Sequence, residues 1–191
     1  MELTDESLLS AHLEGDRAAF RELVRRYADG LLGYLFHMTG NRDQAEDLFQ
    51  ETFKRVHEKA STFRGPRFKG WLFAIATRTA IDHLRRRKRL TVVSLDQGED
   101  CSGGDCPAAG AMADKTSDPA IDIVKQEQKQ QVREAVETLP EKQKATLILA
   151  YYQQLSYQEV AQVLGCSVGT VKTQMSRALG TLARRLPDLS V

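Results

Sequence analysis

The segment from Leu155 to Leu186 constrains the fold of this chain more than any other. Ser156 and Glu159 have the spacing of a capping box, which predicts a short helix that ends at Gly165. Ser167 can cap a second helix, in which apolar residues recur at steps of three and four. The apolar positions expected to face the core in this second helix are Val171, Met175, Ala178, Leu179, Leu182 and Leu186. The segment is therefore predicted to form two helices joined by a tight turn.

Small and apolar residues in this segment have the spacing of a helix-turn-helix. That motif needs a small residue where the helices approach, a glycine in the turn and an apolar residue that holds the second helix in place. Ala161, Gly165 and Val171 occupy these positions. The polar face of the second helix suits phosphates and base edges in a DNA major groove. The residues predicted to bind DNA there are Ser167, Thr170, Lys172, Thr173, Ser176 and Arg177. The alternative is a helical hairpin whose polar face is only solvated.

Charge is distributed unevenly along the 191 residues, although the formal net charge is only +1. Residues 1–92 carry 17 Lys and Arg against 13 Asp and Glu, residues 93–118 carry 1 against 6, and residues 119–191 carry 9 against 7. The middle segment is acidic and rich in small residues, so it cannot bury enough apolar surface to offset the entropy of ordering. We therefore expect an all-α protein with two small helical domains, residues 1–92 and 119–191, joined by a flexible acidic linker, residues 93–118. The C-terminal domain should be a four-helix unit that contains the helix-turn-helix.

Helical periodicity over residues 5–60 predicts three helices, and the third, over residues 42–60, has an acidic side. Acidic residues early in a helix are stabilised by the helix dipole, so a structural reason for them exists. The same residues would also make a docking surface for a basic partner. The acidic and amide residues of this side are Asp43, Glu46, Asp47, Gln50 and Glu51.

Residues 61–71 combine aromatic rings with positive charges in a segment that Gly65, Pro66 and Gly70 mark as a loop. Three rings, Phe63, Phe68 and Trp71, are interleaved with Arg64, Arg67 and Lys69. Aromatic faces beside cations bind unstacked bases, at roughly 1–3 kcal/mol per stacked base. A helix with a basic stripe follows and ends in five basic residues, Arg85 to Arg89. Together these features predict contact with single-stranded or melted DNA. The alternative is that the rings anchor the loop to the core, and for Trp71 burial is the favoured reading.

Features of several other protein classes are missing from the sequence. The N-terminus lacks the basic start and apolar run of a signal peptide, and no stretch approaches the roughly 20 apolar residues of a membrane span, so a cytoplasmic protein is expected. Cys101, Cys106 and Cys166 give no disulfide framework, and no His or further Cys lies near the first two to complete a metal site. A redox pair of Cys101 and Cys106 stays open. Without a nucleophile–base cluster or a phosphate-binding loop, no catalytic residue, metal or cofactor is expected.

Five stretches of the chain, taken together and in order, resemble bacterial RNA polymerase sigma factors of the extracytoplasmic-function (ECF) type. They are DRAAFRELVRRY, NRDQAEDLFQETFKRV, FRGPRFKGWLFAIATRTAIDHLRRR, TLPEKQKATLIL and LSYQEVAQVLGCSVGTVKTQMSRAL. The resemblance implies a dissociable specificity subunit, not an enzyme, that directs the polymerase core to −35/−10 promoters and assists DNA melting. Its implied partners are the RNA polymerase core, promoter DNA and, as for many such proteins, an anti-sigma factor.

The resemblance also assigns roles to the surfaces described above. The acidic side of the third helix corresponds to the surface that binds the clamp helices of the largest polymerase subunit, and the polar face near the C-terminus corresponds to the one that binds −35 DNA. The loop and the helix after it correspond to the segment that captures melted non-template bases of the −10 element. The −10 contacts implied are Phe63, Arg64, Lys69, Trp71, Arg78 and Arg85. Two departures, Thr77-Arg78 in place of Arg-Asn and a loop one residue shorter, leave the preferred −10 bases open.

A different class of function stays open from the residues alone: a stand-alone helix-turn-helix regulator that binds duplex operator DNA by itself. Such a protein would leave the acidic third helix and the aromatic–basic loop without a role. An enzyme with a DNA-binding tail has no motif to support it.

Overall fold

The computed structural model describes residues 3–65, 67–95 and 119–186, and within these ranges every regular element is helical. The N-terminal part contains α1 (Asp5–Leu13), α2 (Arg17–Thr39), α3 (Arg42–Lys59), the short 3-10 helix η1 (Ala60–Thr62) and α4 (Phe68–Leu95). The C-terminal part contains α5 (Pro119–Glu137), α6 (Glu141–Tyr151), α7 (Tyr157–Leu164) and α8 (Val168–Arg185). The predicted all-α class is confirmed.

The helix boundaries follow from capping side chains that the local sequence supplies. Asp16 Oδ1 accepts hydrogen bonds from the backbone N–H groups of Ala18 and Ala19 and so begins α2. Asn41 caps α3 in the same way. Between these two helices, Gly40 ends α2 with φ 71°, a left-handed conformation that glycine adopts without a Cβ clash.

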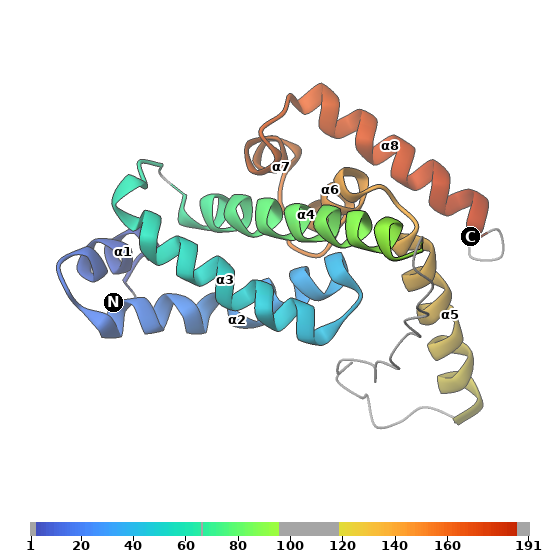
Figure 1. Ribbon diagram of the computed structural model, residues 1–191, viewed down its shortest axis with the longest axis horizontal. Helices are drawn as coiled ribbons and strands as arrows, with labels where there is room; N and C mark the ends of the chain where they lie inside the picture. The colour runs from blue at the N-terminus through green and yellow to red at the C-terminus, as the bar shows by residue number, and fades with distance from the viewer. Residues whose placement is uncertain (1–2, 66, 96–118, 187–191) are drawn as a thin grey trace.

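The N-terminal core lies where α2, α3 and α4 pack against one another, with α1 across one end (Figure 1). It is made of fully buried leucines and aromatic residues, among them Leu23, Leu31, Tyr34, Leu35, Leu72 and Phe73. The Tyr34 hydroxyl lies 2.8 Å from Thr77 Oγ1, so the polar tip of this buried ring has a partner. That contact places Thr77 in the core, only 2% exposed.

The C-terminal domain contains the helix-turn-helix that the sequence predicts. Ser156 and Glu159 form the full capping box of α7, and Gly165 ends that helix with φ 62°. Ser167 Oγ accepts the hydrogen bond from Thr170 N that begins α8. The core-facing side of α8 buries Val171, Met175 and Ala178 as expected, whereas Leu179 of the same helix is 52% exposed. The prediction for Leu179 is therefore wrong, because this position of the helix has turned past the edge of the core.

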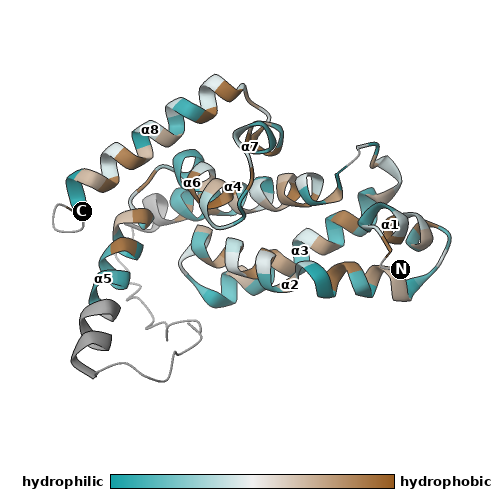
Figure 2. Ribbon diagram, turned by 180° about the vertical axis from the view of Figure 1, so that it is seen from behind, coloured by the Kyte–Doolittle hydropathy of each residue, from teal (hydrophilic) through white to brown (hydrophobic). Residues whose placement is uncertain are grey.

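The two domains share one hydrophobic core, which the sequence did not predict. Helix α7 lies against α4, and α6 lies against both α2 and α4, an arrangement that the ribbon shows from the front in Figure 1 and from behind in Figure 2. Buried residues of α7, including Val160, Ala161 and Val163, belong to the same cluster as Leu72 and Phe73 of α4. The domains are thus packed side by side in this structure.

Two boundaries differ from the sequence expectation. Helix α4 begins at Phe68 instead of at Trp71, so the loop before it is shorter than predicted, and the helix continues to Leu95. Residues 96–118, which contain most of the expected linker together with Cys101 and Cys106, lie outside the described residues. Among the helices that the structure describes, none combines the length and the apolar character that crossing a membrane would require.

Candidate nucleic-acid and polymerase interfaces

The polar face of α8 is exposed along its first three turns. Ser167 Oγ lies 2.9 Å from Thr170 Oγ1, and Thr173 Oγ1 donates to Gly169 O at 3.0 Å, so three hydroxyls are oriented by bonds within the motif. Lys172 and Arg177 are exposed beside them. The structure therefore brings all six residues of the expected −35 set together: Ser167, Thr170, Lys172, Thr173, Ser176 and Arg177.

The three rings of the loop region pack against one another. The ring centroids of Phe63 and Trp71 are 5.1 Å apart, and Phe68 lies 6.2 Å from Phe63 and 5.9 Å from Trp71. Phe68 is completely buried, so it cannot stack on a base and serves as the anchor that the sequence left as an alternative. Phe63 and Trp71 are half-buried and keep part of their faces accessible.

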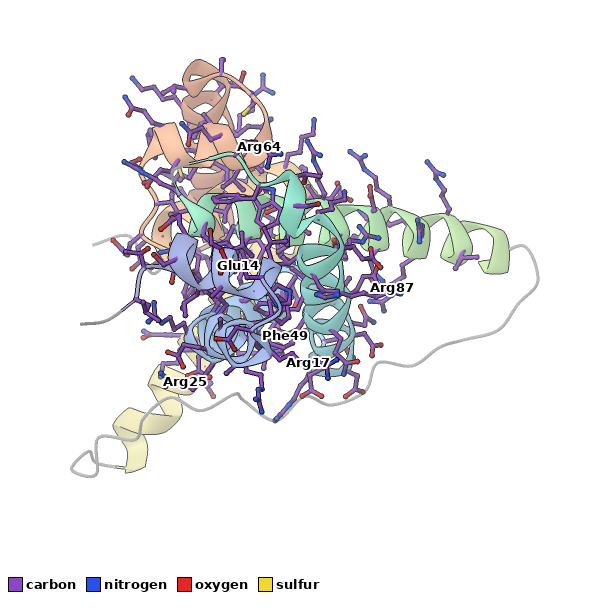
Figure 3. The ribbon with its side chains drawn as sticks, turned by 90° about the vertical axis from the view of Figure 1, so that its left-hand side faces the viewer. Glu14, Arg17, Arg25, Phe49, Arg64 and Arg87 are labelled. Carbon is purple, nitrogen blue, oxygen red and sulfur yellow. The ribbon has the colours of Figure 1, made fainter. Side chains whose placement is uncertain are left out.

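Exposed cations lie in the loop and along the helix that follows it. Arg64 is exposed at the tip of the loop, where Figure 3 labels it, and its guanidinium donates to Ser61 O at 2.6 Å and to Phe63 O at 2.9 Å. These bonds hold the loop in a turn. Arg78 and Arg85 are exposed along α4. Thr77, next to Arg78, is buried and bonded to Tyr34, so it is not available to DNA.

Two cations of the loop region contact the C-terminal domain. Arg67 Nη1 donates to Glu159 Oε1 at 2.6 Å, and Lys69 Nζ donates to the backbone oxygen of Gln153 at 3.1 Å. The Gln153 side chain in turn donates to Gly30 O on α2 at 2.9 Å. Lys69, an expected −10 contact, is thus held between the domains in this structure.

Glu159 serves two structural tasks at once, one with each carboxylate oxygen. Oε2 accepts hydrogen bonds from Ser156 N at 2.9 Å and from Ser156 Oγ at 2.7 Å, while Oε1 accepts from Arg67. The bonds from Ser156, together with the nearby Arg67, lower the pKa of Glu159. The sequence identified Glu159 only as a cap, because no local pattern shows that its second oxygen reaches the N-terminal domain.

Further contacts between the domains were also not predicted from the sequence. The ring of His37 stacks on that of Tyr152 with centroids 4.3 Å apart, and the guanidinium carbon of Arg133 lies 4.5 Å from the centre of the Phe36 ring. Burial lowers the pKa of His37, and the charges of Arg133 and Lys144 lower it further. On the basic end of α4, Lys88 forms an ion pair with Glu141.

The acidic side of α3 is open to solvent and carries both paired and unpaired carboxylates. Glu46 accepts from Arg42 Nε at 2.9 Å and Glu51 accepts from Arg55 Nε at 2.7 Å, each one turn along the helix. Of the predicted polymerase-binding residues, Asp43, Glu46, Asp47 and Gln50 are exposed and Glu51 is half-buried. The five lie on one helix, within nine residues of sequence, as expected. Within the described residues, no group of three or more His, Cys, Asp or Glu side chains is arranged to hold a metal ion.

Two parts of the chain match known families. Residues 23–90 match the family described as Sigma-70 region 2, and residues 129–182 match the family described as Sigma-70, region 4. The first range contains α3, the aromatic–basic loop and most of α4, and the second contains the helix-turn-helix. The fold and its surfaces therefore define a protein of the sigma-70 class, which acts in transcription initiation.

Relatives that match nearly the whole length of the chain identify its family within the sigma-70 class. The chain is 30% identical over 190 residues to the ECF RNA polymerase sigma factor SigW of Bacillus subtilis, with 99% of this chain and 100% of the relative covered. It is 32% identical over 188 residues to the RNA polymerase sigma-H factor of Pseudomonas aeruginosa, with 97% and 95% covered. The chain belongs to the ECF family of RNA polymerase sigma factors. It is an alternative sigma factor that recognises promoters for bacterial RNA polymerase, and it acts in the cell interior, where the polymerase is.

Solved structures agree with this assignment. The sigma factor RpoE of Bartonella quintana, in complex with the anti-sigma factor NepR, is similar with a TM-score of 0.68 and 26% identity, over 90% of this chain and 98% of that one. CnrH, in complex with the cytosolic domain of CnrY, shares the fold with a TM-score of 0.66 at 22% identity, over 97% and 99% of the two chains.

Proposed function

We propose that this sigma factor divides promoter recognition among three surfaces of its own chain. The acidic side of α3 docks on the clamp helices of the largest polymerase subunit, the loop before α4 captures melted −10 bases, and α8 binds duplex −35 DNA. The observation that carries the proposal is that Phe63 and Arg177, expected to touch DNA, both stay accessible although the domains share a core. The domain limits that we assign are residues 1–92 and 119–191.

The proposal for α8 rests on the contrast between its two faces. The buried face packs on α6 and α7 and fixes the helix, while the opposite face presents two cations and four hydroxyls. A rigid helix with exposed Lys and Arg suits the major groove, in which Arg binds guanine edges with two hydrogen bonds. The hydroxyls suit phosphate contacts that set the register of the helix on DNA.

The proposal for the loop rests on two half-buried rings that pack against a buried ring and stay partly exposed to solvent. Phe68 fills the core, so Phe63 and Trp71 lie on a fixed base instead of moving freely. Arg64, Arg78 and Arg85 add positive charge along the path of a single strand. Stacking on such rings is tolerant of base identity, while the cations attract the backbone.

The proposal for α3 rests on charge. Asp43 and Asp47 are exposed without an ion pair to another residue of the described chain, so they offer negative potential to a basic partner. Charge complementarity of this kind directs association and selects the partner. We infer that these carboxylates, with Glu46, Gln50 and Glu51 around them, form the polymerase-binding surface.

The packing between the domains has a functional consequence under this proposal. Lys69 donates to Gln153 and Arg67 is paired with Glu159, so the C-terminal domain engages both cations in part. Movement of that domain away from α4 would free both cations for a DNA strand at the loop. Polymerase would then set the spacing of two weak DNA contacts and make them act together.

We further infer that the protein works without catalysis of its own and in the cytoplasm, since its task is to direct another enzyme that is found there. The structural relative RpoE, which is bound to the anti-sigma factor NepR, supports an anti-sigma factor as an additional partner of this chain. The alternative of a stand-alone operator-binding regulator accounts for α8 alone and leaves α3 and the loop unexplained.

A run-off transcription assay with purified polymerase core separates these possibilities. Promoter-specific RNA that is made only when the chain is added supports the proposal. Tight binding of duplex DNA by the free chain, with no promoter-specific RNA, would instead support the stand-alone regulator. The promoter is first identified by sequencing the transcripts that rise when the protein is overproduced.

A further inference from the structure

The N-terminus of α4 is capped by a carboxylate from a distant helix. Glu6 Oε1, on α1, accepts a hydrogen bond from Phe68 N at 3.1 Å, across 62 positions of sequence. The first N–H groups of a helix have no partner within the helix and favour a nearby anion. The residue before Phe68, Arg67, has a side chain that only donates and is directed to Glu159, so it cannot supply this cap.

A second contact reaches the ring of the same phenylalanine from Tyr27 of α2, whose hydroxyl is bonded to α1. The Tyr27 hydroxyl donates a hydrogen bond to Asp5 Oδ2, and the Tyr27 ring lies 5.5 Å from the Phe68 ring. Asp5 is itself held by Arg26 at 3.0 Å. Phe68 is therefore held at two points, at its backbone by Glu6 of α1 and at its ring by Tyr27 of α2, which Asp5 of α1 holds in turn.

Phe68 in turn packs against the two rings that are partly exposed to solvent. Its ring contacts both Phe63 and Trp71, and these are the two aromatic residues that we assign to −10 DNA. Figure 3 views the molecule from the end where α1 and the loop lie, and it labels Glu14, the residue after α1, and Arg64 of the loop. The chain of contacts thus runs from Glu6 to Phe68 and from Phe68 to the base-binding rings.

We propose that Glu6 is a positioning residue for −10 recognition: it holds the first turn of α4 in place so that Phe63 and Trp71 are arranged before a base arrives. The inference rests on the proposed function of the loop. Binding to a surface that is already arranged avoids the entropy cost of ordering it, so loss of the cap should weaken capture of melted DNA. Core polymerase and −35 DNA, which bind elsewhere, should be unaffected.

The test uses holoenzyme made from polymerase core and the full chain. Capture of melted DNA is followed by the fluorescence of 2-aminopurine placed in the non-template strand of the −10 element, and binding of a duplex −35 fragment is measured in parallel. We expect Glu6→Ala to lower capture about fivefold, the factor by which loss of a cap typically changes a helix-stability equilibrium. Glu6→Gln keeps an acceptor oxygen at the same reach and should stay within about twofold of the parent. Ser10→Ala, on an exposed position of the same helix, is the matched control.

A second readout is local to the loop. Trp71 is the only tryptophan of the chain, so the emission of the free protein reports the surroundings of this ring. Glu6→Ala should change that emission, whereas Glu6→Gln and Ser10→Ala should leave it as it is.

Three outcomes would overturn the inference. Unchanged capture in Glu6→Ala means that the cap does not position the rings. Equal losses of capture, −35 binding and core binding mean that Glu6 only supports folding. The variant Phe63→Ala distinguishes the role of Glu6 from the role of the loop. If Phe63→Ala abolishes capture while Glu6→Ala does not, only the proposed role of Glu6 fails. If Phe63→Ala has no effect on capture, the proposed role of the loop fails and the role of Glu6 fails with it.

Discussion

Arg67 and Glu159 lie 92 positions apart in the sequence, yet the guanidinium of the first donates to the carboxylate of the second at 2.6 Å. This bond links the loop expected to bind melted DNA with the first helix of the helix-turn-helix. The Arg67 side chain remains 66% exposed, so solvent screens the pair. Most of the stability of the interface must come from the apolar contacts between α4 and α7. The ion pair contributes mainly to the relative orientation of the two segments.

The two partners of this bond should differ in their effect on stability. Arg67→Ala removes only an exposed ion pair and should lower the free energy of unfolding by less than about 1 kcal/mol. Glu159→Ala also removes the capping box of α7 and should cost about 1 kcal/mol more. Urea denaturation of both single variants and the double variant measures the two parts. Equal costs for the two single variants would contradict the double role of Glu159.

Lowering the pH through the histidine range should weaken the fold. Burial lowers the pKa of His37 and of His12, so the unfolded chain binds protons more readily than the folded chain at these sites. Stability is therefore present above the ordinary histidine pKa of about 6.5 and is lost as the pH falls below it. The free energy of unfolding should decrease between about pH 7.5 and 5.5.

The variant His37→Phe isolates one part of this effect, because it keeps a ring against Tyr152 and removes the titration. Its stability should fall less steeply over the same pH range than that of the parent. A slope as steep as that of the parent would show that His37 does not contribute.

Binding of −35 DNA should depend on Arg177. If its guanidinium contacts a base edge, Arg177→Ala should weaken binding of a duplex −35 fragment by about 1–3 kcal/mol, and mainly for the correct sequence. Arg21→Ala, an exposed arginine of α2, removes the same charge in the other domain and serves as control. Equal weakening on correct and scrambled DNA would mean that Arg177 contacts phosphate only.

Polymerase binding should depend on the acidic side of α3. Asp47→Arg together with Glu51→Arg reverses two charges of this surface and should greatly reduce the affinity for core polymerase, while the helix content by circular dichroism stays the same. Glu58→Arg reverses an exposed charge near the end of the same helix and should bind core normally. Core binding that survives the double reversal would place the docking surface elsewhere.

Two glycines of α2 should respond in opposite ways to alanine. Gly40 has φ 71°, and a Cβ there would lie 2.6 Å from Glu137 Oε1, so Gly40→Ala should destabilise the protein by about 1–2 kcal/mol. Gly33 lies within the helix with open space around its Cβ position, so Gly33→Ala should stabilise by about 0.5–1 kcal/mol. Thermal unfolding of the two variants shows whether the sign differs.

The helices themselves could be predicted from the sequence because local side chains determine where they begin and end. The capping box at Ser156, the turn at Gly165 and the cap at Ser167 each act within a few residues, and each appears in the structure as predicted. The six residues of the α8 face also follow from a single helical period. Local patterns of this kind need no knowledge of the rest of the fold.

The packing of the domains could not be predicted, because it depends on pairs that are distant in sequence. Nothing near Gln153 indicates that its amide reaches Gly30, or near Phe68 that Glu6 of α1 accepts from its backbone N–H. Leu179 followed the apolar period of α8 but is 52% exposed, because no neighbouring helix of the described residues covers it. In each case a tertiary neighbour decided what the local pattern left open.

The two carboxylate oxygens of Glu159 bind different partners, and this affects how the two domains can separate. Oε2 keeps its bonds to Ser156 whether or not Oε1 is engaged, since the capping box is complete within its own short segment. Separation of the domains therefore breaks the bond to Arg67 without unwinding the first turn of α7. The helix-turn-helix can leave the loop as a finished rigid unit, and it needs no refolding step before it meets DNA.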